Sequence, residues 1–320
     1  MSDKSGPLVA PHRGFPYPVS RFRSYAVLAV VVGAAMWPVR ARAVVELRDD
    51  RGAVVRLAAP AKRIVALAPS LTELTYAAGA GERLVGVARF SDYPAAARRV
   101  MEVGDASRVD IERIVALEPQ LVLAWKSGNQ AGDIAKLSRL GHEVFVTEPV
   151  RLADIARLLR AIGALAGTDA AAERAARTFE QGVRALRQRY AGARKVRALY
   201  EIWPRPFITV SGRHMISDVI ALCGGENVFA DAWGLTPSIS LEAAVAAGPE
   251  VIVGGARAGS AADFRREWRR SPVAVLRSLP AFYVDPDLIQ RQTPRILEGA
   301  RIICAAFDTV RGDAAADERR

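Results

Sequence analysis

The side chains that most often carry catalysis or bind metals are few and scattered in this sequence. It has three histidines, His12, His142 and His214, and two cysteines, Cys223 and Cys304. A histidine-rich zinc or manganese site needs three or four convergent ligands, which these positions do not offer. The chain also lacks a G-x-S-x-G elbow, an H-E-x-x-H pair, a Walker loop and a G-x-G-x-x-G turn. We therefore expect no catalytic residues and no metal site, and the sequence favours binding over catalysis.

Aromatic side chains, in contrast, follow predicted strands or helices at five places. Ligands of open α/β sheets bind at the carboxyl ends of the strands, and rings supply apolar contact area at low entropic cost. A large, flat, partly apolar ligand is therefore expected to contact Phe90, Tyr93, Trp125, Trp203 and Trp233. The alternative for each tryptophan is a place in a lobe core. Trp125 is the strongest ligand candidate, because Gly128 and Asn129 beside it favour a turn.

Two glutamates occupy matched positions in a repeated stretch. DIERIVALEPQLVL at Asp110–Leu123 aligns with SLEAAVAAGPEVIV at Ser240–Val253, and Glu112 matches Glu242. Each copy predicts a polar N-cap, a short helix, a proline that ends it and a strand. A carboxylate in the first turn is favoured by the helix dipole, which alone would explain both residues. The alternative is a two-point contact with two basic sockets on a partner.

A repeat with copies so far apart implies two similar lobes rather than a solenoid. Strands alternate with helices through most of the chain, which predicts largely parallel sheets. We expect an α/β fold with two Rossmann-like lobes, joined by one long helix, and a ligand cleft between them. The expected parts are residues 44–167 for the N-terminal lobe, 168–190 for the interlobe helix, 191–308 for the C-terminal lobe and 309–320 for a frayed, charged tail.

Three local features complete this expectation. Ser70 followed by Glu73 predicts a capping box at the start of the first helix. The stretch Phe282–Thr293 is expected to be a loop, and Pro294–Phe307 the last helix.

The first 43 residues have the pattern of a secretory signal. Arg21 and Arg23 precede an apolar run, Tyr25–Val39, and an Ala-Arg-Ala site ends at Ala43. The run has roughly 15 residues, whereas a bilayer span needs about 20, so we expect export with cleavage rather than a membrane anchor.

Charge and cysteine usage fit an exported protein. The formal net charge is +11, but the arginines are spread along helices rather than interleaved with aromatic residues, which argues against a nucleic-acid surface. In an exported chain, two cysteines favour a single disulfide; the alternative is a pair of buried thiols.

Several of these stretches resemble a known family. RIVALAPSLTELTYAAG, FSDYP, DIERIVALEPQLVLAWKSGN, ALCGGENVF and TPRI are similar to segments of the periplasmic cobalamin-binding proteins (BtuF-type) of ABC importers. The resemblance covers about residues 62–308. It implies a substrate-binding protein that captures a corrinoid, such as cobalamin or cobinamide, in the periplasm and delivers it as a monomer to an inner-membrane ABC permease dimer. Haem- and siderophore-binding relatives share the scaffold, and an exported hydrolase using Ser91, Asp92 or the acids at 285 and 287 is the alternative of another class.

The resemblance also assigns roles by position. Phe90 and Trp125 correspond to ligand-contacting aromatics, and Glu112 and Glu242 to the acids that dock onto arginines of the permease. Cys223 and Cys304 fall where the family has its disulfide. The second-lobe ligand loop corresponds to Asp287, Leu288, Ile289 and Arg291. No cofactor is implied apart from the bound ligand. Haem would need an axial ligand, for which only Tyr93 and His214 are placed.

Overall fold

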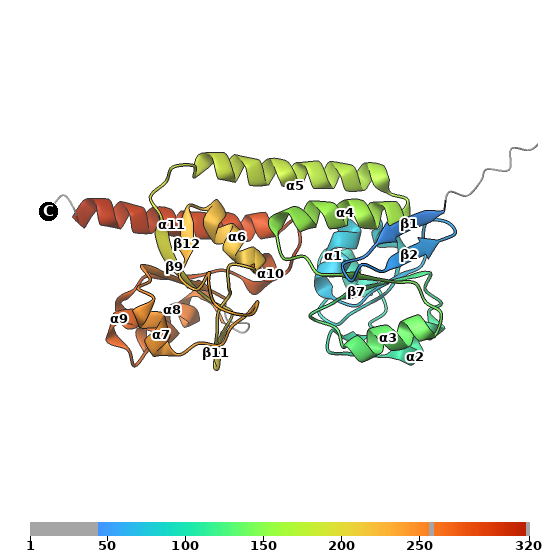
Figure 1. Ribbon diagram of the computed structural model, residues 1–320, viewed down its shortest axis with the longest axis horizontal. Helices are drawn as coiled ribbons and strands as arrows, with labels where there is room; N and C mark the ends of the chain where they lie inside the picture. The colour runs from blue at the N-terminus through green and yellow to red at the C-terminus, as the bar shows by residue number, and fades with distance from the viewer. Residues whose placement is uncertain (1–43, 256–258, 318–320) are drawn as a thin grey trace, which may run out of the picture. The chain divides into compact units, whose positions relative to one another are not determined.

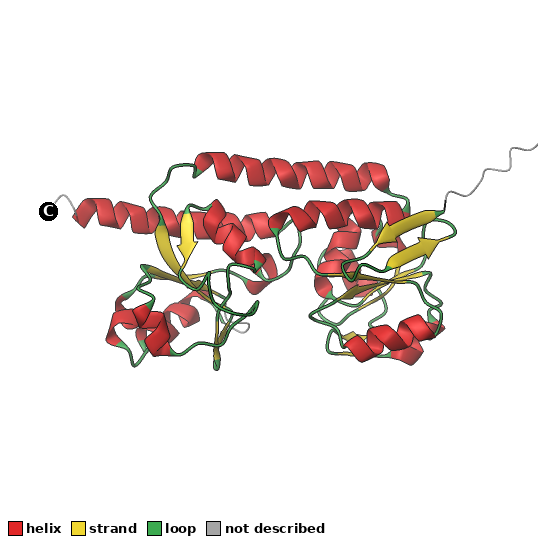
Figure 2. Cartoon of the chain, in the orientation of Figure 1, coloured by secondary structure: helices red, strands yellow, loops and turns green. Residues whose placement is uncertain are grey.

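The computed structural model describes residues 44–255 and 259–317; the expected signal segment, residues 1–43, lies outside them. Two four-stranded sheets organise the described chain (Figures 1 and 2). The first has the order β4-β3-β7-β8 and the second β12-β9-β13-β14, with every neighbouring pair parallel. These strands are β3 (Ile64–Ala66), β4 (Leu84–Val87), β7 (Leu121–Trp125), β8 (Val144–Thr147), β9 (Val196–Glu201), β12 (Gly225–Asn227), β13 (Val251–Gly254) and β14 (Ala281–Tyr283). The expected α/β class with parallel sheets is confirmed.

Both faces of each sheet are buried, which is why the strands are almost entirely apolar. In β3, Ile64 and Ala66 join one core cluster while Val65 joins another, as the alternation of side chains in a strand requires. The larger cluster continues through both lobes, whereas each opposite face has its own smaller cluster. The helices on the shared side are α1 (Pro69–Ala77), α4 (Leu152–Ala166), α5 (Asp169–Arg189), α6 (Met215–Leu222) and α11 (Ile296–Asp317). Those on the separate sides are α2 (Ile111–Ala116), α3 (Ala131–Arg139), α7 (Leu241–Ala246), α8 (Ala261–Arg269) and α9 (Ala274–Ser278).

Helix α5 is the long helix expected between the lobes, with 21 residues. Gly182 does not break it. A Cβ at Gly182 would lie 2.5 Å from Cδ1 of Leu297, so the glycine allows α5 to approach α11 closely.

The remaining elements are short and lie outside the two four-stranded sheets. They are β1 (Val45–Arg48), β2 (Val54–Leu57), β5 (Gly104–Asp105), β6 (Arg108–Val109), β10 (Trp203–Pro204), β11 (Phe207–Ile208), α10 (Pro286–Ile289) and the 3₁₀ turns η1 (Gly81–Arg83) and η2 (Ala95–Arg99).

Three local predictions are wrong. Helix α1 starts at Pro69 with Ala68 as its N-cap and no side-chain capping bond, because Glu73 is drawn into ion pairs with two arginines. The stretch Phe282–Thr293 is not all loop, since it contains the end of β14 and the short helix α10.

The third correction concerns the charged tail, because α11 continues to Asp317 instead of fraying after Asp308. Its extension is anchored by Val310, which is only 8% exposed. Arg311 adds hydrogen bonds to the carbonyls of Arg194, Cys223 and Gly224.

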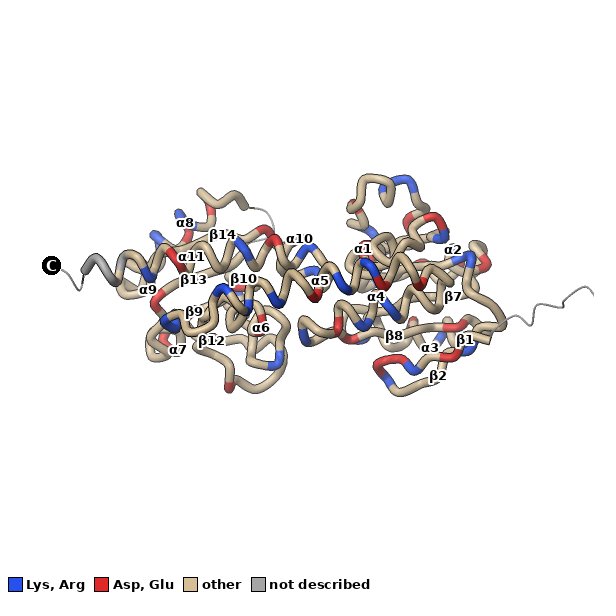
Figure 3. Tube along the Cα trace, turned by 90° about the horizontal axis from the view of Figure 1, so that it is seen from above, with Lys and Arg blue, Asp and Glu red and all other residues tan. Residues whose placement is uncertain are grey.

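Three further features concern the described chain as a whole. Cys223, the C-cap of α6, and Cys304 of α11 form a disulfide, which ties the end of one helix of the second lobe to another. Basic and acidic residues are interspersed along the chain rather than gathered on one element (Figure 3). Within residues 44–255 and 259–317, no helix is long and apolar enough to cross a bilayer.

Candidate functional site

A cavity of about 340 Å³ is lined by residues that follow strands of both sheets. The first lobe contributes Trp125 at the end of β7 and the segment after β8. The second contributes Ile202, which follows β9, and residues at the start of α6. The lining residues are Trp125, Ser127, Glu148, Pro149, Val150, Ile202, His214, Met215, Ile216, Leu235, Thr236, Gln290 and Gln292. We call this cavity the cleft. Its place matches the expected binding edge of parallel sheets.

Trp125 is held in the cleft wall by the turn that follows β7. Its backbone N–H donates to Oδ1 of Asn129 at 2.7 Å, and the amide of Asn129 donates to the carbonyls of Leu67 and Ala106. A Cβ at Gly128 would lie 1.9 Å from the Trp125 ring, so only glycine leaves room for the indole there. The turn expected from Gly128 and Asn129 is present, and it fixes the orientation of the ring.

A second hollow, of about 520 Å³, shares Val150 and Leu235 with the cleft and carries Trp233 on its wall. Trp233 is 91% exposed, so it belongs to no core. A large exposed ring beside an apolar cavity is typical of a ligand or partner contact.

The two lobes are joined near the cleft by a buried ion-pair cluster. Glu73 of α1 has a side chain only 2% exposed and accepts hydrogen bonds from Arg291 at 2.8 Å and from Arg295 at 2.6 and 3.0 Å. We call Glu73, Arg291 and Arg295 the clasp. A carboxylate buried this deeply is stable only when paired and hydrogen-bonded, and here both guanidinium groups come from the second lobe.

Arg291 reaches further acids around the clasp. It contacts Asp92 at 2.9 Å and Asp287 at 2.8 Å, and it donates to the carbonyl of Phe90 at 3.3 Å. Burial by itself would raise the pKa of Asp92, but the hydrogen bond and charge of Arg291 hold that pKa below its ordinary value. For Asp287, burial prevails over Arg291 and raises the pKa. The main role of Arg291 is therefore to link the two lobes through ion pairs and hydrogen bonds.

Phe90 and Tyr93 lie beside this cluster. Phe90 has a positive φ of 65° and a side chain that is 55% exposed. Tyr93 is 46% exposed, and the guanidinium of Arg295 lies 3.9 Å from its ring centroid, within the range of a cation–π contact.

The remaining predicted contacts have different surroundings. Trp203 lies in the β10–β11 hairpin, is 41% exposed and donates from its indole nitrogen to the carbonyl of Arg205. Leu288 is half-buried in α10, whereas Ile289 is 1% exposed and packs in the shared core. Ile289 therefore has no surface for a ligand, because its side chain anchors α10 instead.

His214 has a defined hydrogen-bonding role at the cleft. As the N-cap of α6, its Nδ1 accepts a hydrogen bond from the backbone N–H of Ile216 at 3.1 Å. Burial lowers the pKa of His214 to about 4, so the imidazole is neutral near pH 7. Because Nδ1 accepts, the proton of the neutral ring is on Nε2.

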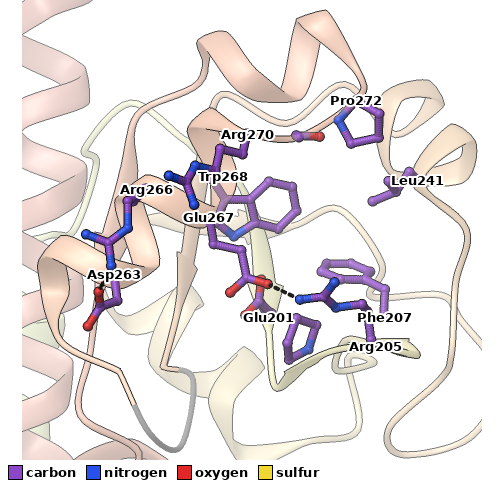
Figure 4. A pocket seen from close by; sticks show the side chains of 12 residues that line it. Glu201, Arg205, Phe207, Leu241, Asp263, Arg266, Glu267, Trp268, Arg270 and Pro272 are labelled. Carbon is purple, nitrogen blue, oxygen red and sulfur yellow. Dashed lines mark hydrogen bonds and ion pairs between the residues drawn. The ribbon is translucent and has the colours of Figure 1, made fainter.

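A larger cavity, of about 550 Å³, lies within the second lobe (Figure 4). Its aromatic wall is formed by Phe207 and Trp268, whose rings meet edge to face at 5.7 Å. Glu201 lies next to the Arg205–Glu267 ion pair and is 1% exposed. Burial, followed by the charge of Glu267, raises the pKa of Glu201 to about 7.

The two repeated glutamates are both exposed and both lie in the first turn of their helices, Glu112 in α2 and Glu242 in α7. The expected N-caps are confirmed, since the side chains of Asp110 and Ser240 accept from the backbone N–H three residues later. Each lobe thus presents one acid on a matched element.

Four side chains that shape these sites are not indicated by the sequence pattern. Glu73 was expected to cap a helix, and Arg295, Glu201 and the N-cap role of His214 were not foreseen. The only signal for the clasp was two arginines four residues apart near the start of the last helix. Their partner is more than two hundred residues away, and sequence patterns do not show such pairs.

Comparison with known proteins places this geometry among binding proteins. A family model described as "Periplasmic binding protein" matches residues 64–280. The "Vitamin B12-binding protein" of Vibrio parahaemolyticus is 34% identical over 252 residues, which cover 79% of this chain and 91% of that protein. The crystal structure of the periplasmic vitamin B12 binding protein BtuF of Vibrio cholerae superposes with a TM-score of 0.71 at 33% identity, covering 79% of this chain and 98% of that one. The apo form of the periplasmic heme-binding protein RhuT from Roseiflexus shares the fold, with a TM-score of 0.66 at 23% identity over 78% of this chain and 98% of that one.

Proposed function

The chain belongs to the periplasmic binding protein family, and we propose that it captures a corrinoid between its two lobes and delivers it to an inner-membrane ABC permease. The family is one of binding proteins rather than enzymes, so an exported hydrolase is excluded. The observation that carries the proposal is the cleft, where Trp125 and apolar residues from both lobes meet a few polar groups, in a chain 34% identical to a vitamin B12-binding protein.

The proposed ligand contacts are the aromatic residues around the cleft and the half-exposed residues of the short helix α10. They are Phe90, Tyr93, Trp125, Trp203, Trp233, Asp287 and Leu288, with Arg291 acting through the clasp. The proposed organisation keeps the boundaries 44–167, 168–190 and 191–308. The protein acts in the periplasm as a monomer after removal of residues 1–43.

Haem is the second candidate, because the shared fold includes a heme-binding protein. Haem iron is held by a protein ligand such as histidine or tyrosine. His214 carries its proton on Nε2, so it is not arranged as a metal ligand, and the ring of Tyr93 is stacked against Arg295. The corrinoid is favoured because its metal can keep its own axial ligands.

Calorimetry on the mature chain tests the choice. Titration with cobalamin, cobinamide and haem should give a one-to-one complex with at least one corrinoid at micromolar affinity or tighter, and weaker binding of haem. A Trp125→Ala variant should weaken corrinoid binding, whereas Trp268→Phe, in the core of the second lobe, should not. Absence of binding to every corrinoid would overturn the ligand assignment.

For the permease, we propose that Glu112 and Glu242 form the two contact points. Their support is the symmetry of α2 and α7 and the exposure of both carboxylates. Because both glutamate side chains are exposed, neither has a packing role in its lobe that a partner contact would disturb.

A further inference from the structure

We infer that His214 and Gln292 recognise the peripheral amide groups of the corrinoid, and that His214 does not ligate the bound metal. This assignment rests on the proposed function and specifies which part of the ligand the cleft recognises.

The first step concerns the proton of His214. The Nδ1 atom of His214 is occupied as acceptor of the Ile216 N–H at the start of α6. The neutral ring therefore has its proton on Nε2, which makes no hydrogen bond with any residue of the described chain. A nitrogen that carries a proton has no lone pair for a metal. Ligation would require the proton to leave Nε2 and move to Nδ1, and the Ile216 N–H would then lose its acceptor.

The second step concerns the other polar groups of the cleft. Gln292 is 9% exposed, lines the cavity, and its carboxamide has no hydrogen-bond partner within residues 44–255 and 259–317. Ser127 and Glu148 lie on the opposite lobe and already satisfy each other, with a hydroxyl-to-carboxylate distance of 2.9 Å. The cleft groups without a partner thus include an imidazole N–H donor and the carboxamide of Gln292, which both donates and accepts. Two further donors, Nε1 of Trp125 and Nε2 of Gln290, are also unpaired in the part of the chain that the structure describes.

The third step matches these groups to the ligand. The edge of a corrin ring carries several acetamide and propionamide side chains, each with one carbonyl acceptor and one NH₂ donor. A neutral N–H and a carboxamide pair directly with such groups, whereas a carboxylate edge would bring charge to a site where burial keeps His214 neutral. Because buried polar groups need partners, these contacts discriminate more strongly than the aromatic wall does.

Aquocobinamide is the probe for the metal. It has exchangeable axial water, so replacement of that water by imidazole would shift its visible absorption bands. The bands should be the same for the free ligand, the wild-type complex and the complex with His214→Asn, whose shorter amide can still accept from Ile216. A band shift in the wild type that is absent from His214→Asn would overturn the inference. His142→Asn, on the first lobe, is the matched control.

Affinity tests the amide contacts. Each lost hydrogen bond should weaken cobinamide binding about three- to tenfold in His214→Asn and Gln292→Met. Cobyrinic acid, with carboxylates in place of the amides, should bind more weakly than cobinamide to the wild type. The difference in affinity between the two ligands should be smaller in both variants. Equal affinities for the two ligands, unchanged in both variants, would overturn the inference while leaving corrinoid binding in place. Failure of both ligands and cobalamin to bind would instead overturn the proposed function.

Discussion

The two lobes share one topology but not one chemistry. Strands β3 and β9 are equivalent inner strands of sheets with the same order, and the equivalent strands β7 and β13 begin within the two copies of the repeated stretch. Yet β7 ends in Trp125, whereas β13 ends in Gly254 and is followed by Gly255. The first lobe thus gives the cleft its fixed aromatic wall.

The second lobe supplies His214 and the two arginines of the clasp, whereas Ser127 and Glu148 are polar cleft groups from the first lobe. His214 caps a helix that faces the cleft, Arg291 and Arg295 hold Glu73 across the lobes, and β9 ends in the buried acid Glu201. The disulfide is also confined to this lobe. The comparison shows that a duplicated scaffold keeps its sheets and its exposed acids, while the residues at the strand ends differ between the lobes.

The largest expected effect is on corrinoid uptake, and it comes from the exposed acid that each lobe presents at a matched position. Reversing both acids, with Glu112→Arg and Glu242→Arg, should abolish corrinoid uptake in cells and leave corrinoid affinity unchanged, because the permease contact is lost while the cleft is intact. Each single reversal should give an intermediate loss. Uptake by a strain that lacks the native gene is the measurement.

The matched control is another exposed glutamate from each lobe, Glu82 beside β4 and Glu226 in β12, which is the equivalent strand. Reversing these two makes the same charge change and should leave uptake near wild type. Uptake that persists in the Glu112/Glu242 double variant would remove the docking assignment.

The next largest effect is on stability, and it comes from the clasp between the lobes. Glu73→Gln leaves two guanidinium groups without their buried carboxylate, which should cost about 3–5 kcal/mol in the free energy of unfolding. Asp287→Asn removes a carboxylate that is 47% exposed from the same Arg291, and it should cost less than about 1 kcal/mol. Urea unfolding followed by circular dichroism measures both. Similar small costs for the two variants would show that the clasp contributes no more than a surface pair.

The smallest expected effect is a pH-dependent change in stability at Glu201, the buried acid that ends β9. The pKa of Glu201 is raised from 4.5 to about 7, so between these values the native state holds a proton that the unfolded state has lost. Stability should therefore fall as pH rises through this window, and Glu201→Gln should be more stable than the wild type by about 3 kcal/mol at pH 8 and equal to it near pH 4. Glu226→Gln is the exposed control. A wild type and Glu201→Gln with parallel stability profiles would show that Glu201 ionises normally.

Much of the fold was predictable because it depends on local patterns. The apolar strands, the long helix α5 and the N-caps Asp110 and Ser240 are each specified by neighbouring residues, and the structure has them where the sequence indicates. The tail was mispredicted because the contacts of Arg311 with Arg194, Cys223 and Gly224 are distant in sequence.

The site was predictable only in part, for the same physical reason. Trp125 could be singled out because Gly128 and Asn129 are its neighbours in the chain. The role of Glu73 could not, since a capping box satisfies every local rule and the competing arginines lie in the other lobe. Ile289 likewise looked suited to a ligand loop, but α10 turns its side chain into the core.

The absorption spectrum of the protein purified from the periplasm of its native host tests the central claim most directly. Corrinoids and haem have distinct visible bands, so the ligand identifies itself without a choice of probe. The account predicts corrinoid bands that remain with the protein through gel filtration and disappear in a Trp125→Ala variant. A Soret band of haem in their place would contradict it.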